Sequence, residues 1–104
     1  MLVQRRADHR LRIEIEDDTG APLNMTGWTV YAQIWNKERT TKYADFAVQY
    51  TDRPNGVFHI SLTAAETTSL PCESFYDVML EDTSGFKQYY LEGLVYISEG
   101  YTAP

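Results

Sequence analysis

The chain is poor in the residues that most catalytic and metal sites require. It contains two histidines, His9 and His59, and a single cysteine, Cys72. A zinc or iron site needs several His, Cys or carboxylate ligands at defined offsets, and this set is too small to supply them. One cysteine also excludes an intrachain disulfide, so the fold does not depend on an oxidising compartment. We therefore expect no metal or other cofactor.

Glycine is scarce as well, with six residues that never cluster. Nucleotide- and phosphate-binding loops need grouped glycines, and the chain also lacks a G-x-S-x-G nucleophile elbow. Asp77 and Glu92 could act as a carboxylate pair only if the fold brought them together, which the sequence does not determine. We interpret Asp77 instead as a half-buried latch that accepts hydrogen bonds from a neighbouring loop. The sequence therefore predicts no enzyme.

An acidic cluster near residue 16 raises the question of a calcium site. It consists of Glu14, Glu16, Asp17 and Asp18. Side chains alternate along a strand, so only half of them could converge on one ion. A solvated turn is the favoured interpretation.

Long hydrophobic runs are missing too. No window approaches the roughly twenty apolar residues of a membrane-spanning helix, and the N-terminus lacks the apolar region of a signal peptide. We expect a protein that is neither exported by a signal peptide nor embedded in a membrane.

Positive charge is concentrated in the first twelve residues. The net charge is −6, yet Arg5, Arg6, Arg10 and Arg12 are opposed only by Asp8 within the first twelve residues. That stretch carries +3 and the rest of the chain −9. An acidic body argues against nonspecific binding of nucleic acid, which requires a basic face. Residues 1–12 are either a basic strand whose charge deters stray edge pairing, or an arm that docks on an acidic neighbour such as another copy.

The abundant feature is aromatic side chains, with eight tyrosines and 13% aromatic residues overall. Tyrosine packs well on a pleated sheet and also provides contact area at low entropic cost. Apolar residues recur at every second position, which predicts strands. The alternating sets are Leu11, Ile13 and Ile15; Trp28, Val30, Ala32 and Ile34; Ala44, Phe46, Val48 and Tyr50; Phe58, Ile60 and Leu62; Tyr76, Val78 and Leu80; and Tyr89, Leu91, Val95 and Ile97.

Turn signals separate these segments at 17–20, 52–56 and 82–85. Thr63 and Glu66 fit a capping box that opens a short helical corner before Pro71. Gly93 interrupts the last strand and marks either a bulge or a close backbone approach. We expect one domain over 1–104, an Ig-like antiparallel β-sandwich, or a partly open barrel, of about six to eight strands. No helix is long enough for a βαβ crossover, which excludes a parallel sheet.

Four aromatic residues fall opposite the predicted core if the alternation holds: Tyr31, Trp35, Tyr90 and Tyr96. Folding alone does not explain large rings on a solvated face. They either cap a sheet edge or barrel rim, or form a patch for protein contact. Carbohydrate stacking is a third interpretation, for which Trp35 followed by Asn36 is the one hint.

Several segments together resemble a family of small phage proteins and phage-protein domains. The matching segments are 18–23 (Asp-Thr-Gly-Ala-Pro-Leu), 25–30 (Met-Thr-Gly-Trp-Thr-Val), 32–34 (Ala-Gln-Ile), 56–58 (Gly-Val-Phe), Leu62, 67–70 (Thr-Thr-Ser-Leu), 75–78 (Phe-Tyr-Asp-Val), Gly85, 91–93 (Leu-Glu-Gly) and Thr102. Genes for this family lie among tail, baseplate and fibre genes, and the N-terminal domain of siphophage upper baseplate proteins looks similar. Most of the matching positions are turn and packing residues.

The resemblance implies a β-sandwich that serves as a docking or attachment module of the virion, without cofactor or catalytic residues. Its implied partners are other virion proteins and further copies of itself. Trp35 departs from the family, which often has an arginine there. Family domains continue into fibre or receptor-binding segments, whereas this chain ends at Pro104, so we expect a decoration, adaptor or connector protein. The alternative is a carbohydrate-binding module that helps the particle adhere to its host.

Overall fold

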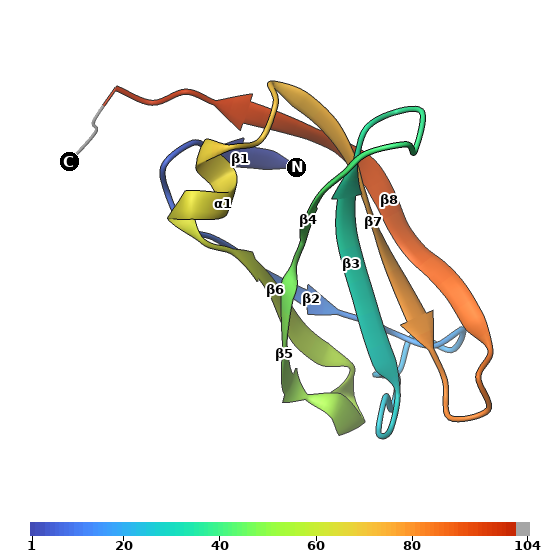
Figure 1. The fold of residues 1–104 in the computed structure, drawn as a ribbon. Helices are drawn as coiled ribbons and strands as arrows, with labels where there is room; N and C mark the ends of the chain where they lie inside the picture. Colours follow the sequence, from blue (N-terminus) through green and yellow to red (C-terminus); the bar gives the residue numbers. More distant parts are fainter. Residues whose placement is uncertain (102–104) are drawn as a thin grey trace.

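The computed structural model describes residues 1–101, and its regular secondary structure is mostly strands (Figure 1). The elements are β1 Leu2–Gln4, β2 His9–Glu14, β3 Thr29–Trp35, β4 Lys42–Asp45, β5 Ala47–Asp52, the 3₁₀ turn η1 Arg53–Asn55, β6 Val57–Leu62, α1 Ala64–Thr68, β7 Glu73–Glu81 and β8 Lys87–Ser98. Within the described residues, no helix has the length and apolar character needed to cross a membrane.

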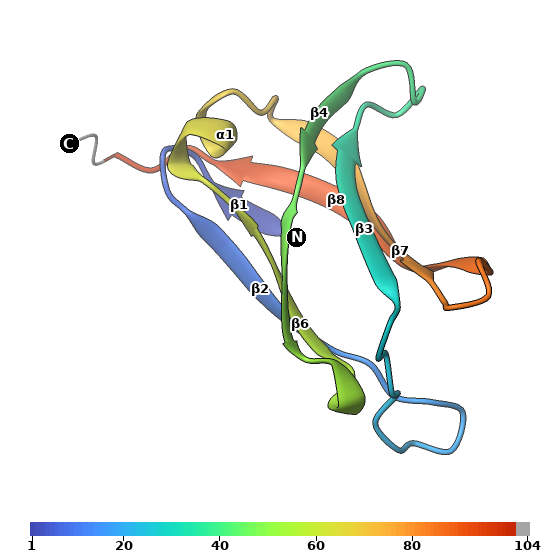
Figure 2. The same ribbon diagram turned by 60° about the horizontal axis from the view of Figure 1, so that its bottom comes forward.

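The strands form two sheets that face one another (Figures 1 and 2). The larger sheet has the order β1-β8-β7-β3-β4, and the smaller has the order β2-β6-β5. This architecture confirms the predicted all-β sandwich. The expected helical corner is also present: the Thr63 hydroxyl accepts a hydrogen bond from the Glu66 backbone, and the Glu66 side chain accepts one from Thr63.

The core lies between the sheets and uses the inward positions that the alternation predicted. Phe58 and Ile60 of the smaller sheet meet Ile34 and Val78 of the larger one, and all four side chains are fully buried. Burying a side chain of this size contributes roughly 1.5–3 kcal/mol relative to exposure, so this layer holds the sheets together.

One predicted strand is divided in two. The apolar alternation runs unbroken from Ala44 to Tyr50, but the chain changes sheet at the buried Phe46. The ring of Phe46 then packs edge-on against Tyr76, with 6.5 Å between ring centroids. Alternation reports which side chains point inward, and it cannot report that consecutive inward residues belong to different sheets.

The exclusion of parallel pairing is wrong at one edge. β1 pairs with β8 in parallel, with Leu2 opposite Tyr96 and Gln4 opposite Ser98. Figure 2 shows the first strand, in blue, beside the last strand, in red. A single crossover helix is unnecessary here, because the rest of the domain connects the two strands.

The last strand contains a bulge, but not at the predicted residue. Val78 lies opposite Leu91 while Met79 lies opposite Tyr89, so Tyr90 is the extra residue. Side chains before and after this point are therefore out of step with a simple alternation.

Gly93 was predicted to mark either a bulge or a close backbone approach, and the structure shows a close approach of a different kind. A Cβ atom at this position would lie 3.1 Å from Cε1 of Tyr76. The close approach is thus by an aromatic ring and not by another backbone, and the missing side chain lets Tyr76 lie against the strand.

Candidate contact surfaces

The outer surface of the larger sheet carries two rows of large side chains. In one row Tyr31, Met79 and Tyr89 are cross-strand neighbours, and in the other Trp35, Phe75 and Leu94 are. Cross-strand neighbours point to the same side of a sheet. We call these six residues the aromatic face.

The polar atoms of Tyr31 and Trp35 are partnered within the sheet. The Tyr31 hydroxyl donates to Glu81 at 3.0 Å, and this hydrogen bond raises the pKa of Tyr31 above its ordinary value. Nε1 of Trp35 donates to Oε1 of Gln33 at 2.9 Å. Tyr31 is nevertheless 39% exposed and Tyr89 52% exposed. The rings therefore offer mainly apolar area to the solvent.

Two of the four predicted surface aromatics belong to the aromatic face, and two do not. Tyr31 and Trp35 lie there as expected. Because of the bulge, Tyr89 takes the place predicted for Tyr90, which lies on the opposite side of the strand and lines a separate groove. Tyr96 is 47% exposed beside the exposed Leu2, at the β1 end of the same sheet.

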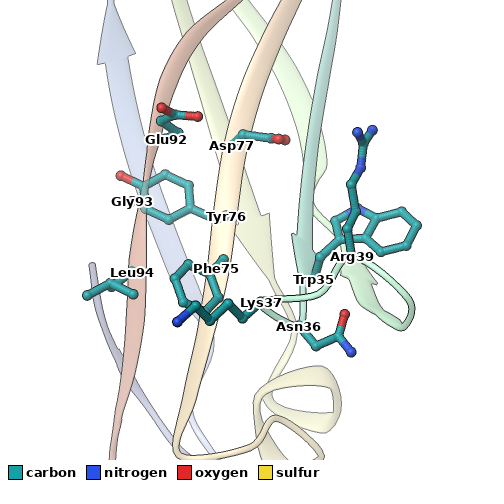
Figure 3. A pocket seen from close by; sticks show the side chains of 10 residues that line it. All are labelled: Trp35, Asn36, Lys37, Arg39, Phe75, Tyr76, Asp77, Glu92, Gly93 and Leu94. Carbon is teal, nitrogen blue, oxygen red and sulfur yellow. The ribbon is translucent and has the colours of Figure 1, made fainter.

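A hollow of about 480 Å³ opens beside Trp35 (Figure 3). Its rim includes Asn36 and Arg39 of the loop between β3 and β4. The Asn36 side chain holds this loop by accepting hydrogen bonds from the backbone of Thr40 and Thr41. The guanidinium of Arg39 lies 5.9 Å from the centre of the Trp35 ring, within cation–π range.

The lining of the hollow includes both members of the candidate carboxylate pair. Asp77 and Glu92 are directly opposite each other on β7 and β8, which the sequence could not determine. Burial raises the pKa of Asp77, Arg39 opposes this shift, and Glu92 adds to it. Within residues 1–101, no hydrogen bond reaches the Asp77 carboxylate, so the predicted latch is not formed. Like charges directly opposite destabilise a sheet, which makes this pair a poor structural element.

The Arg5 side chain is bound by other residues of its own domain. It donates to the backbone carbonyls of Thr68 and Leu70 at 2.8 and 2.7 Å, and it pairs with Glu99 at 2.8 Å. We call these four residues the Arg5 clasp. The contact with Arg5 lowers the pKa of Glu99. The clasp joins the end of β1 to the helical corner and to the segment after β8.

Arg6 is also turned toward the domain, whereas Arg10 and Arg12 are not. Arg6 donates to the carbonyl of Glu99 at 2.7 Å. Arg10 and Arg12 are exposed on the outer surface of β2. Arg10 donates to Gln49 at 2.8 Å, and Arg12 pairs with Glu14 on its own strand. Residues 1–12 thus form two strands of the sandwich and not a projecting arm.

A second hollow, of about 380 Å³, lies between the β2–β3 connection and the β7–β8 hairpin. We call it the acidic groove. Its apolar lining includes Trp28, Leu80, Phe86 and Tyr90, and its carboxylates are Glu16, Asp17, Asp18 and Asp82. Within residues 1–101, no group of three or more His, Cys, Asp or Glu side chains is placed to hold a metal ion.

The comparisons with known proteins give a fold and no family. No protein-family description and no curated protein matches the sequence. Among solved structures, the chain is similar to the Lin-41 filamin domain with a TM-score of 0.53 and 15% identity, covering 95% of this chain and 84% of that domain. The likeness supports an Ig-like sandwich and concerns the fold alone, because one fold serves many unrelated functions.

Proposed function

We propose that the chain is a structural docking module of a bacteriophage particle and holds other virion proteins through its aromatic face. The observation that carries this proposal is the gathering of half-exposed rings on one sheet. Tyrosine, tryptophan, phenylalanine and methionine are enriched at protein interfaces, where they form the energetic centre.

The other sheet serves as an internal reference. Its outer positions carry short or charged side chains, such as Arg10 opposite Ser61 and Ser61 opposite Ala47. That sheet packs on the same core, and its described outer positions include His59 but no tyrosine, tryptophan or phenylalanine. Large aromatic residues on the aromatic face are thus more than the sandwich needs for folding.

The phage assignment is supported by the sequence resemblance and is compatible with the fold. The shared positions include Met25, buried to 1% exposure, and Gly56, whose φ of +69° favours glycine. They are positions that specify a sandwich of this shape, so the resemblance describes the fold more closely than it describes the partner.

Carbohydrate binding is the second candidate, because the hollow beside Trp35 combines a ring with Asn36, Asp77 and Glu92. Its volume lies within the usual range of about 300–1,000 Å³ for small-ligand sites. However, Arg39 already stacks near the Trp35 ring, and the ring N–H is taken by Gln33. A sugar would have to displace Arg39, so protein docking is the better supported function.

The test is incorporation into particles of the phage whose genome encodes the chain. Tagged wild-type chain supplied during infection should be found by mass spectrometry in gradient-purified particles. The Tyr31→Ser/Tyr89→Ser variant should remain folded but be depleted from them. A matched control, Ala47→Ser/Thr51→Ala, changes the outer surface of the other sheet without altering a partner of Arg10 and should be incorporated normally.

Two results would contradict the proposal. The wild-type chain could be absent from purified particles, or both variants could be incorporated equally. Binding of host polysaccharide by the wild-type chain and not by Trp35→Ala, together with absence from particles, would establish the carbohydrate function instead.

A further inference from the structure

We propose that copies of this chain associate head to tail, with Arg10 and Arg12 of one copy inserted in the acidic groove of the next. The inference deepens the proposed docking function and rests on it for its role, since it names one partner as a second copy. It depends on two surfaces that lie outside the aromatic face.

The groove has the chemistry of a receptor for guanidinium groups. Its lining includes Trp28 and Tyr90, and Phe86 on the hairpin is 65% exposed. Four carboxylates surround these rings, and no lysine or arginine is part of the lining. Arginine combines stacking on aromatic rings with bidentate pairing to carboxylates, so it fits such a surface better than lysine does.

The groove is also a fixed structure. Oδ1 of Asp17 accepts hydrogen bonds from the backbone and hydroxyl of Thr19, and Oδ1 of Asp82 accepts the same pair from Ser84. These bonds lower the pKa of both aspartates, which therefore stay charged in mildly acidic solution. Because these turns are already held in place, they lose little conformational entropy when a partner binds.

Arg10 and Arg12 are the matching surface, which we call the basic pair. They alternate on β2, so their side chains leave the same side of the strand roughly 7 Å apart. Arg12 pairs with Glu14 of its own strand and Arg10 donates to Gln49; both contacts are exposed and of small worth, so a second copy can replace them. Arg5 and Arg6, by contrast, are held by the domain itself.

The two surfaces are different patches of one molecule, which determines the kind of assembly. A contact between unlike patches leaves one free groove and one free basic pair at the ends of every dimer. Such heterologous contacts build rings if they close and open chains if they do not. A twofold dimer would instead place the basic pair of each copy in the groove of the other and would stop growing at two chains, which distinguishes it from the head-to-tail contact.

The test uses two variants that each lose one surface. Arg10→Gln/Arg12→Gln removes the basic pair and keeps the groove. Glu16→Lys/Asp18→Lys cancels the negative charge of the groove and keeps the basic pair; Asp17 and Asp82 are left intact because they hold turns. Sedimentation velocity over about 10–500 µM should show the wild type growing with concentration and each variant associating at least about tenfold more weakly.

A mixture of the two variants provides the decisive result. The intact groove of the first should bind the basic pair of the second, giving a one-to-one dimer that cannot grow. Glu38→Lys/Glu73→Lys carries the same change of net charge as the groove variant, away from both surfaces, and should associate like the wild type. Circular dichroism confirms that every variant is folded.

The inference is overturned if the wild type stays monomeric over this range, if the mixture forms no dimer, or if the Glu38/Glu73 control is impaired as strongly as the groove variant. Tyr31→Ser/Tyr89→Ser should associate normally, because neither ring belongs to these surfaces. Normal self-association without particle incorporation would contradict the proposed function alone, and the reverse would contradict this inference alone.

Discussion

The two outer surfaces of the sandwich cover the same core yet differ in kind. On the larger sheet, Tyr31 and Tyr89 are half-exposed rings beside a half-buried Trp35. On the smaller sheet, the corresponding surface has Arg12 and Gln49 on either side of His59. The smaller sheet is the ordinary case of an antiparallel sheet with apolar residues inside and polar ones outside.

This difference separates what folding requires from what it does not. Both sheets meet the same demand for inward apolar side chains, and only one adds aromatic residues outside. The excess on that sheet is the part of the sequence that a role in binding explains.

The strongest contrast should be between adjacent residues on β6. Phe58 is fully buried, and His59 points outward, where its Nδ1 lies 2.6 Å from the Thr51 hydroxyl. Phe58→Ala should lower the free energy of unfolding by about 3–5 kcal/mol through lost burial and a cavity. His59→Ala should change it by less than about 1 kcal/mol. Urea denaturation measures both, and similar losses would mean that the inner and outer surfaces of this sheet are wrongly assigned.

Gly56 tests how the β2–β3 connection is joined to the smaller sheet. Its φ is +69°, and a Cβ atom would lie 2.6 Å from the carbonyl oxygen of Ile15 and 2.8 Å from that of Leu23. Gly56→Ala should cost about 3 kcal/mol or more, because backbone must move in addition to the unfavourable φ.

Gly85 is the matched control, since it has a φ of +89° but no atom within 4 Å of an added Cβ. Gly85→Ala should cost only about 1 kcal/mol. Equal thermal shifts for the two substitutions would contradict the close packing described around Gly56.

The Arg5 clasp should make stability depend on pH. Arg5 lowers the pKa of Glu99 below its ordinary 4.5, so the folded state favours the charged carboxylate. This stabilisation is present above about pH 4.5 and is lost as the pH falls through the lowered value. The difference in melting temperature between wild type and Arg5→Ala should therefore shrink between about pH 6 and pH 3.

Glu99→Gln separates the two parts of the clasp. It removes the titrating carboxylate and keeps the bonds from Arg5 to the carbonyls of Thr68 and Leu70. It should be more stable than Arg5→Ala near neutral pH. If the difference in melting temperature between wild type and Arg5→Ala stays constant across the acid range, the ion pair does not contribute to stability.

The smallest effect on stability is expected where the effect on binding is largest. Tyr31→Ser/Tyr89→Ser removes two half-exposed rings and the hydrogen bond to Glu81. We expect a loss of only about 1 kcal/mol in the free energy of unfolding, within the range of surface substitutions and one exposed hydrogen bond. A loss above about 3 kcal/mol would mean that the two rings are needed for folding, and their exposure would no longer support a binding surface.

The sequence predicts the inward positions well and the pairing between distant segments poorly. Val30, Ile60 and Leu80 lie inside as their alternation indicates, and the capping box at Thr63 forms as expected. These features depend on neighbouring residues, so a local pattern contains the information.

What the sequence could not predict is set by long-range geometry. The change of sheet at Phe46 leaves the alternation intact, and the bulge at Tyr90 exchanges the surface positions of two adjacent tyrosines. The partners of Arg5 are carbonyls and a carboxylate far away in sequence, so nothing next to Arg5 could indicate that it is bound. Of the four predicted contact arginines, the two whose side chains stay exposed at the surface are Arg10 and Arg12 on β2.

The parallel pairing of β1 with β8 has a mechanical consequence. Tension that pulls β1 toward the N-terminus and β8 toward the C-terminus slides two parallel strands past each other. Their hydrogen bonds, which run from Leu2 opposite Tyr96 to Gln4 opposite Ser98, are then stretched together and not one after another. The Arg5 clasp continues the same seam to Glu99. A domain connected in this way resists extension along its chain direction better than an antiparallel terminal pair, which opens bond by bond.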